Sequence, residues 1–352
     1  MQMDRIKLLK LADNILGKFL IQFCPSRINN NTVPGQEIKK ILIIRPGGIG
    51  DLTLLLPAIH LLRSKFTTAE IDLLCEKRNS GIAALAEGIN NVYLYDHGLD
   101  LIKCLRNRYD VVIDTEQWHR LSAVVTHLTG ASIKIGFDTN ERRKVYTHKI
   151  PYSHDDYEVY SFLNLFKPLV DNDMAFDENK PFLTVAQKER DKTVAIFPGA
   201  SIAERRWSTE KFSEVAKTFS NLGYKILLLG SKKETKAAEA IKKSVPACID
   251  FTSKLDLKGV AGVLAASKLL LTTDSGLMHL SYAVGTPTVS LFGSGIETKW
   301  APRGRKDLII NKHLACSPCT KFGYTPACDR NIECLSLISA NEVISAMEKL
   351  LR

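Results

Sequence analysis

The segment that decides the fold is Thr272 to Gly293, TTDSGLMHLSYAVGTPTVSLFG. It follows the apolar run Leu269 to Leu271, which is typical of a buried parallel strand. Asp274-Ser275-Gly276 predicts a tight turn into a short helix, and TPTVSLFG predicts the next strand and another glycine turn. A strand that ends in this way just before a helix presents backbone N–H groups and a hydroxyl to an anion.

This turn has two interpretations. His279 lies four residues after Ser275, so both side chains face the same side of the first helical turn. In one interpretation the turn binds a diphosphate, and Asp274 beside it contacts a sugar or a metal. In the other it is an ordinary strand–turn–helix in which Asp or Ser caps the helix. The segment by itself leaves both open.

A second strand–turn–helix pattern spans Lys39 to Phe66, KKILIIRPGGIGDLTLLLPAIHLLRSKF. Its glycines, at 47, 48 and 50, do not match the G-x-G-x-x-G of dinucleotide folds. A triphosphate P-loop is excluded as well, because Gly50-Asp51-Leu52 stands where Gly-Lys-Ser/Thr is required. Asp51 would repel phosphate, which leaves it two roles. It stabilises the helix dipole, or it acts as a base on a hydroxyl.

Strands and helices alternate through both halves, which predicts an α/β protein. In the first half the predicted strands are AEIDLLC, NVYLY and DVVID. Acidic residues, Trp118, His119 and Arg120 follow DVVID, where ligands of open α/β sheets bind. The basic group Arg142, Arg143 and Lys144 is either a site for an acidic acceptor or a solvated loop.

The second half restarts with the strand TVAIFPGAS, which ends in a glycine turn and the hydroxyl of Ser201. Ser208 is a good N-cap for a helix over residues 209–222. Arg205 and Arg206 precede it in a loop at the carboxyl edge of the sheet, where guanidinium groups can neutralise a diphosphate. Glu234 follows the next strand and can accept hydrogen bonds from ribose hydroxyls.

Composition favours a soluble globular protein with two domains. The chain has 352 residues, 45% of them apolar and 24% charged. Its net charge of +10 lies mostly in the second half, because residues 1–186 carry 23 Lys+Arg against 22 Asp+Glu and residues 187–352 carry 25 against 16. That charge suits an anionic ligand or membrane. The absence of zinc-finger histidines, an aromatic RNA-binding pattern and a long basic tract speaks against nucleic acid.

Residues 1–23 predict an amphipathic helix. One face carries apolar residues and another carries lysines; the apolar residues are Leu8, Leu11, Ala12, Ile15, Phe19 and Phe23. The helix either packs on the body of the protein or lies in a membrane interface. No apolar run is long enough to span a bilayer, no cleavable signal peptide is evident, and we expect a cytoplasmic protein.

The eight cysteines fall into two groups. Cys24, Cys75, Cys104 and Cys248 are scattered in apolar or helical context, as buried structural thiols are. The other four lie close together near the C-terminus: Cys316, Cys319, Cys328 and Cys334. This second group is compatible with a closed structural zinc site, with redox-labile disulfides or with buried thiols.

Together, three stretches resemble the heptosyltransferases of glycosyltransferase family 9. IIRPGGIGDLTLLLPAIHLLR resembles the family's (R/K)-x-S-S-I-G-D turn and Pro-containing helix. PGASIAERRWSTEKF resembles its PGAS or PGT followed by a basic residue and Trp-x-x-E-x-F/W. TTDSGLMHLSYAVGTPTVSLFG is similar almost residue for residue to T-x-D-S/T-G-x-x-H-L-A-x-A-x-G-x-P-x-V-x-L-F-G. The resemblance covers roughly residues 39–350, in the right order.

The resemblance implies a GT-B fold, with two Rossmann-like domains whose parallel sheets face a central cleft. We expect an N-terminal helix and linker over 1–38, an acceptor-side domain over 39–185, and a nucleotide-sugar-binding domain over 186–352. It implies inverting, metal-independent transfer from a nucleotide sugar, usually ADP-heptose, to an anionic glycolipid, the lipopolysaccharide inner core. The enzyme would then work on the cytoplasmic face of the inner membrane.

The implied residue roles follow the motifs. Asp51 is the general base, Arg205 with Ser201 nearby neutralises the donor phosphates, and Glu234 binds the ribose. The third motif supplies the diphosphate ligands Ser275, Gly276 and His279, while Asp274 binds sugar hydroxyls. One departure is that Gly47-Gly48 replaces the family's Ser-Ser, which leaves the sugar and acceptor open. The alternatives are a GT-B transferase for a different nucleotide sugar and a catalytically silent nucleotide-sugar-binding protein.

Overall fold

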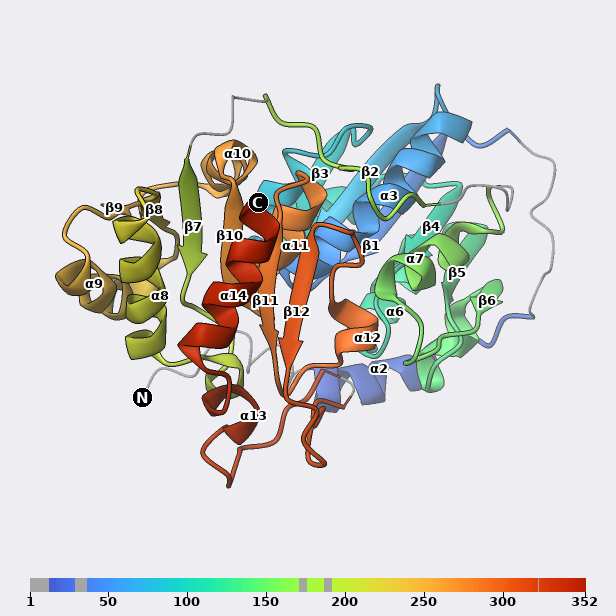
Figure 1. The fold of residues 1–352 in the computed structure, drawn as a ribbon. Coiled ribbons are helices and arrows are strands. Elements are labelled where there is room, and N and C mark those ends of the chain that lie inside the picture. The colour runs from blue at the N-terminus through green and yellow to red at the C-terminus, as the bar shows by residue number, and fades with distance from the viewer. Residues whose placement is uncertain (1–12, 29–36, 171–175, 187–191, 322) are drawn as a thin grey trace. The chain divides into compact units, whose positions relative to one another are not determined.

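The computed structural model describes residues 13–28, 37–170, 176–186, 192–321 and 323–352. It contains two compact units, Met1–Phe176 and Asp177–Arg352, each built on one six-stranded parallel sheet (Figure 1). Residues 1–12 of the predicted N-terminal helix and residues 29–36 of the predicted linker lie outside the described residues. No helix in the described ranges has the length and apolarity needed to cross a bilayer.

The sheet of the first unit has the strand order β3-β2-β1-β4-β5-β6. The strands are β1 Lys40–Arg45, β2 Glu70–Cys75, β3 Asn91–Leu94, β4 Val111–Asp114, β5 Ile133–Phe137 and β6 His148–Ile150. The helices are the π-helical turn η1 Asp13–Gly17, α2 Lys18–Phe23, α3 Ile49–Lys65, α4 Ser80–Ala83, α5 Gly98–Arg106, α6 Leu121–Leu128, the 3-10 turn η2 Glu141–Val145, and α7 Glu158–Phe166. The runs of β1, β2 and β4 are almost completely buried, as expected of a parallel sheet covered on both faces.

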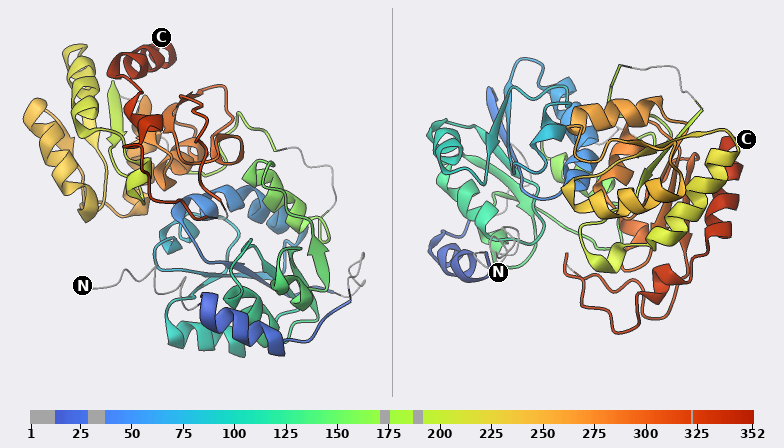
Figure 2. Two further views of the ribbon diagram at one scale, coloured as in Figure 1. Left: turned by 90° about the horizontal axis from the view of Figure 1, so that it is seen from below. Right: turned by 90° about the vertical axis from the view of Figure 1, so that its left-hand side faces the viewer.

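The second unit repeats this plan with the order β12-β11-β10-β7-β8-β9. Its strands are β7 Thr193–Phe197, β8 Lys225–Leu228, β9 Ile249–Asp250, β10 Leu269–Thr273, β11 Thr288–Phe292 and β12 Asp307–Asn311. Its helices are η3 Ala203–Arg205, α8 Thr209–Asn221, η4 Lys232–Glu234, α9 Thr235–Ser244, α10 Leu257–Ala266, α11 Gly276–Ala283, α12 Glu297–Trp300, α13 Glu333–Ser336 and α14 Ala340–Leu351. Figure 2 shows the C-terminal α14 running beside α8.

The predicted elements around the three motifs are confirmed. Ser208 caps α8, because its hydroxyl accepts the Lys211 N–H. The predicted helix of the Lys39–Phe66 pattern is α3, which begins at Ile49, within the glycine turn, and runs through Pro57. Cys24, Cys75, Cys104 and Cys248 are buried, as expected. Burial raises the pKa of Cys75 to about 12, and the carboxylates of Asp96 and Glu76 add to the effect.

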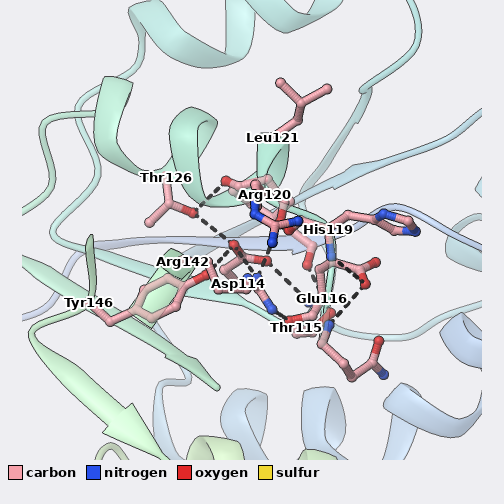
Figure 3. A network of polar contacts seen from close by, with 12 residues as sticks. Asp114, Thr115, Glu116, His119, Arg120, Leu121, Thr126, Arg142 and Tyr146 are labelled. Atoms are coloured by element: carbon pink, nitrogen blue, oxygen red, sulfur yellow. Dashed lines mark hydrogen bonds and ion pairs between the residues drawn. The ribbon is translucent and has the colours of Figure 1, made fainter. Parts of the chain in front are cut away.

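The basic group at 142–144 is not one exposed patch, so that part of the sequence interpretation is wrong for Arg142. Its side chain is fully buried and forms an ion pair of 2.7 Å with Asp114, also fully buried, at the end of β4. The Tyr146 hydroxyl donates to the same carboxylate at 2.7 Å, and Thr126 approaches it at 3.5 Å (Figure 3). Arg142 also donates to the Glu116 carbonyl. Two charges can stay in an apolar interior only when each is paired in this way.

We expect Arg142→Met to lower the free energy of unfolding of the first unit by about 3–5 kcal/mol, because it leaves the Asp114 carboxylate buried without its cation. Urea denaturation followed by circular dichroism measures this. The control is Arg143→Met: the neighbouring arginine pairs with Asp138 at 2.9 Å but is 57% exposed, so its loss should cost under about 1 kcal/mol. Equal destabilisation by the two variants would contradict the assignment.

Candidate active site

Both sheets have a topological switch point, and the site residues lie there. In the first sheet the chain proceeds from β1 to β2 and β3, and later places β4 on the other side of β1. In the second, β8 and β9 extend one side of β7, and β10 lies on the other. Ligands of open parallel sheets bind at such a point, in the crevice outside the carboxyl ends of the strands. The loops after β1 and β4 are therefore the candidate site of the first unit, and the loops after β7 and β10 are that of the second.

Asp51 is the third residue of α3, at the switch point of the first sheet. Its Oδ2 accepts the Gly48 N–H at 2.8 Å, so it caps the helix that it begins. Its Oδ1 pairs with Nη2 of Arg45 at 3.1 Å. The helix-stabilising role is therefore confirmed. The side chain is still 26% exposed, which leaves the carboxylate accessible to a hydroxyl.

Arg45, the last residue of β1, fixes the Asp51 side chain through this ion pair. Its side chain is 3% exposed. Its Nη1 donates to the Thr115 carbonyl at 2.7 Å and to Oε1 of Gln117 at 3.3 Å. The guanidinium carbon lies 5.3 Å from the centre of the Phe162 ring. The contacts with Thr115, Gln117 and Phe162 fix the orientation of the guanidinium and so the direction of its remaining N–H groups. The buried contacts of Arg45 therefore set the orientation of the Asp51 carboxylate.

Charge balance around Arg45 comes from acids of several elements. Burial by itself would lower the pKa of the Arg45 guanidinium, but the carboxylates of Asp51, Glu116 and Glu158 outweigh it and raise that pKa. Glu158, on α7, is connected to this group through Gln117, whose side-chain amide donates a hydrogen bond to the Glu158 carboxylate.

Gly47 and Gly48, which replace the family's serines, fit this arrangement closely. Gly47 has φ of +129°, a conformation that side chains disfavour. A Cβ at Gly48 would lie 2.8 Å from Oδ2 of Asp51. The two glycines thus let the carboxylate fold back onto the Gly48 N–H and meet Arg45. A side chain at Gly48 would therefore displace the Asp51 carboxylate.

In the second unit the third motif folds as predicted, with β10 leading into α11. Ser275 is the N-cap of α11; its hydroxyl accepts the Met278 N–H at 3.4 Å and lies 3.0 Å from the Thr272 hydroxyl. Gly276 opens the helix and is half-buried. His279 is 5% exposed, with its ring centre 6.3 Å from that of Trp300 on α12. The capping interpretation of this turn is confirmed, and a helix N-terminus remains a favourable position for an anion.

The structure joins Arg205 and Asp274 directly. Nη1 of Arg205 lies 3.0 Å from Oδ2 of Asp274, which is almost fully buried. Asp274 packs so closely on Gly295, in the loop after β11, that a side chain there would collide with its carboxylate. Ser201 is exposed in the loop after β7 and has no hydrogen bond to either residue within the described chain. The position of Arg205 is therefore fixed by its ion pair with Asp274 and not by a contact with Ser201.

Glu234 lies over the turns after β7 and β8. A Cβ at Gly199 would lie 2.5 Å from its Cγ, and one at Gly230 would lie 2.7 Å from its Cβ. Its carboxylate accepts the N–H of Ser231 at 2.8 Å and the hydroxyl of Ser231 at 2.7 Å. The side chain is 6% exposed. Glu234 thus lies after β8 and against the loop after β7, with one carboxylate oxygen already hydrogen-bonded inside the protein.

The C-terminal cysteines do not form a metal site in the structure. The described residues contain no group of three or more histidine, cysteine, aspartate or glutamate side chains placed to hold a metal ion, so structural zinc at Cys316, Cys319, Cys328 and Cys334 is not supported. Burial raises the pKa of Cys334, and the other three thiols add to that effect. The N–H groups of Cys319 and Thr320 donate to the Ser294 carbonyl at 3.2 and 3.0 Å. This loop therefore supports the turn that contacts Asp274.

Comparison with known proteins identifies the class of protein. The sequence model of glycosyltransferase family 9 (heptosyltransferase) matches residues 99–326. Lipopolysaccharide heptosyltransferase 3 of Escherichia coli (strain K12) is 28% identical over 343 residues, covering 86% of this chain and 95% of that protein. The chain belongs to glycosyltransferase family 9, the heptosyltransferases, and is a glycosyltransferase.

Solved structures agree in fold. E. coli ADP-heptose lps heptosyltransferase II matches with a TM-score of 0.72 and 21% identity, covering 89% of this chain and 98% of that one. E. coli heptosyltransferase WaaC, solved with ADP and with ADP-2-deoxy-2-fluoro heptose, matches with a TM-score of 0.71 and 19% identity, covering 88% and 99%. The predicted GT-B class, with two Rossmann-like parallel sheets, is confirmed.

Sequence reasoning missed the residues that hold the site in place. The position of Arg45 could have indicated its role, since it ends a predicted strand directly before the glycine turn. Gln117 lies in the stretch after β4 that was already marked as a ligand region. Glu158 had none, because it is 41 residues from Gln117 in sequence and meets it only through the packing of α7.

We expect Gly48→Ala to lower kcat by about tenfold with little change in donor KM, because the new Cβ displaces the Asp51 carboxylate from its position. Steady-state kinetics measures both constants. Gly98→Ala is the matched control, since a Cβ there meets nothing within 4 Å and should leave kcat unchanged. An unaltered kcat in Gly48→Ala would show that the position of Asp51 does not matter for turnover.

Glu116 predicts an acid-dependent loss of stability. Burial would raise the pKa of its carboxyl, but His119, Arg45, Arg142 and the Trp118 N–H outweigh this and lower the pKa to about 2, from a usual 4.5. The folded state therefore gains stability from the ionised form above about pH 4.5 and loses it as the pH falls towards 2. We expect Glu116→Gln to lack this part of the pH dependence in denaturant titrations. The control Glu37→Gln, with a side chain that is 78% exposed, should retain it.

Proposed function

We propose that this enzyme transfers heptose from ADP-heptose to the lipopolysaccharide inner core with inversion at the anomeric carbon. The observation that carries the proposal is the carboxylate of Asp51, fixed by Arg45 and Gly48 yet partly exposed at the switch point of the first sheet. Support for the donor comes from the neighbour WaaC, solved with ADP and a fluorinated ADP-heptose. Support for the acceptor comes from the name of the E. coli relative, lipopolysaccharide heptosyltransferase 3.

In the proposed mechanism Asp51 takes the proton from the acceptor hydroxyl. The acceptor oxygen attacks the anomeric carbon of the heptose, and the bond from that carbon to the β-phosphate oxygen of ADP breaks. A single displacement of this kind inverts the configuration. Because the attacking oxygen becomes more nucleophilic as its proton leaves, a positioned carboxylate contributes about 10²–10⁴-fold to the rate.

The departing diphosphate is bound by groups of the second unit. Arg205 supplies a guanidinium, which suits phosphate oxygens. The N-terminus of α11, with Ser275 and Gly276, supplies N–H groups, and His279 supplies an imidazole. These groups provide positive charge where negative charge develops in the transition state, so the proposal needs no metal cofactor. Asp274 binds the sugar hydroxyls, Glu234 the ribose, and Ser201 lies near the phosphates.

Release of Arg205 from Asp274 is the step that donor binding requires. In the structure the two side chains neutralise each other at 3.0 Å. An incoming diphosphate competes for the guanidinium and frees one Asp274 oxygen for a sugar hydroxyl. The same pair can therefore recognise the phosphate and the sugar of one donor.

The proposed cellular location follows from the acceptor. The inner core is attached to a lipid, so the enzyme works in the cytoplasm at the inner face of the inner membrane. A GT-B transfer with another nucleotide sugar remains the alternative, and the observation that favours it is Gly47-Gly48 in place of the usual serines. A catalytically silent nucleotide-sugar-binding protein is the second alternative.

The test crosses two variants against two measurements. We expect Asp51→Asn to lower kcat by about 10²–10⁴-fold, while ADP still raises the melting temperature as in the wild type. We expect Arg205→Gln to weaken ADP binding by about tenfold or more, because a charge-assisted hydrogen bond is lost. Arg206→Gln is the matched control, since this neighbouring arginine is exposed.

The result separates the alternatives. Stabilisation by ADP above that by UDP and GDP supports the donor, and the reverse order favours the alternative transferase. Wild-type turnover in Asp51→Asn would remove Asp51 as the base. A wild type that binds ADP but transfers heptose to no core acceptor would favour the silent binding protein.

A further inference from the structure

The helical segment Asp13–Phe23 packs on the first unit by an unexpected face. It consists of a π-helical turn, Asp13–Gly17, followed by α2, Lys18–Phe23. Ile21 is fully buried and, with Cys24, packs against Ala123, Val124, Val145 and Tyr146. Asp13 accepts the N–H groups of Arg120 and Leu121, each at 2.7 Å, at the start of α6. The segment is therefore held on the protein by burial and by a carboxylate that caps a helix.

The apolar face predicted from the sequence points away from this contact. Five apolar side chains form a stripe at helical spacing, and they are 61, 53, 61, 38 and 72% exposed: Ile15, Leu16, Phe19, Leu20 and Phe23. Ile28 just beyond is 85% exposed. The described chain has fourteen strongly exposed large apolar side chains, and these are six of them. Exposed apolar residues are ordinary when scattered, but a contiguous group marks an interaction surface.

Cations border the stripe. Lys18 is exposed between the apolar residues, and Arg27 is exposed beyond the helix. Nζ of Lys144 donates to the Gln22 carbonyl at 3.0 Å, and Nζ of Lys149 to the Arg27 carbonyl at 2.9 Å. Beside the helix is an open hollow of about 470 Å³, lined by Gln22, Ser26, Asn140, Glu141, Arg143, Lys144 and Lys149. Acids near these cations already have partners: Glu141 pairs with Arg120, Asp138 pairs with Arg143, and the buried Asp13 accepts the N–H groups of Arg120 and Leu121.

We propose that this surface, comprising residues 15–28 with Lys144 and Lys149, docks the enzyme on a bilayer that contains anionic phospholipid. An interfacial helix places its apolar side chains at the boundary of headgroups and acyl chains, with its cations among the headgroups. Anionic lipids attract such basic residues over about a Debye length. The inference rests on the proposed function in one respect, namely that the acceptor is a glycolipid held in such a bilayer.

Charge favours a bilayer over a second copy of the chain. A symmetric dimer formed through this surface would place the same patch of each protomer against the other. Such a dimer would bring Lys18, Arg27, Lys144 and Lys149 of one protomer near the same four cations of the other, and bringing like charges together disfavours association. A lipid surface instead presents phosphates to all four.

The test is flotation with vesicles of phosphatidylcholine alone and of phosphatidylcholine mixed with phosphatidylglycerol. We expect the wild type to float with the mixed vesicles and not with the neutral ones, and high salt to reduce its binding. We expect Phe19→Ser/Phe23→Ser to bind mixed vesicles at least tenfold more weakly. Lys144→Gln/Lys149→Gln should bind more weakly and depend less on salt.

The control is Leu99→Ser/Leu337→Ser, which removes two side chains that are 66 and 54% exposed elsewhere on the chain. It should bind like the wild type. Circular dichroism and melting temperature confirm that each variant is folded. Absence of wild-type binding, or equal loss in the control and phenylalanine variants, would overturn the proposal. A wild-type dimer by light scattering that Phe19→Ser/Phe23→Ser converts to monomer, without vesicle binding, would assign the surface to a second copy.

Transfer to a water-soluble core oligosaccharide, measured in parallel, separates this proposal from the proposed function. We expect Phe19→Ser/Phe23→Ser to retain wild-type kcat on that acceptor. Vesicle binding by a wild type that transfers to no acceptor would leave the docking surface standing and overturn the proposed function. Full transfer by a wild type that does not bind vesicles would leave the proposed function standing and overturn the docking surface.

Discussion

The parallel direction of the strands is the constraint on which the candidate site residues of each unit depend. Because all strands of a parallel sheet end at the same edge, residues far apart in sequence meet there without further design. Asp51 and Gln117 lie close for this reason in the first unit, where Arg45 contacts both. Arg205 and Asp274 meet for the same reason in the second, after β7 and β10.

Glycines after the strands allow the carboxylate side chains to pack closely against the backbone. Gly48 lets the Asp51 carboxylate return to the backbone, and Gly199 and Gly230 leave room for Glu234. At Gly295 the chain passes directly against Asp274. In each case the missing Cβ allows a carboxylate to lie against backbone, where N–H groups can hold it.

The first unit buries the side chains of Arg45 and Arg142, and the contacts of each explain how this charge is tolerated. Arg45 and Arg142 are both almost fully buried, and each contacts a carboxylate and at least one backbone carbonyl. Burying either ion without a partner would be strongly unfavourable. The Arg45–Asp51 ion pair at the carboxyl end of β1 therefore positions the Asp51 carboxylate, and the Arg142–Asp114 pair neutralises the buried charge at the end of β4.

The sequence alone determined the strand–turn–helix units, the caps at Ser208 and Ser275, the family, and Asp51 as the acid of the first turn. Such features depend on residues within a few positions of one another, so local spacing suffices to find them. Only the tertiary structure decided that Arg142 is buried against Asp114 and that Glu158 reaches Gln117. It also decided that the apolar stripe with Phe19 and Phe23 faces solvent. Periodicity identifies an apolar face but not what covers it, because that depends on packing partners more than a hundred residues away.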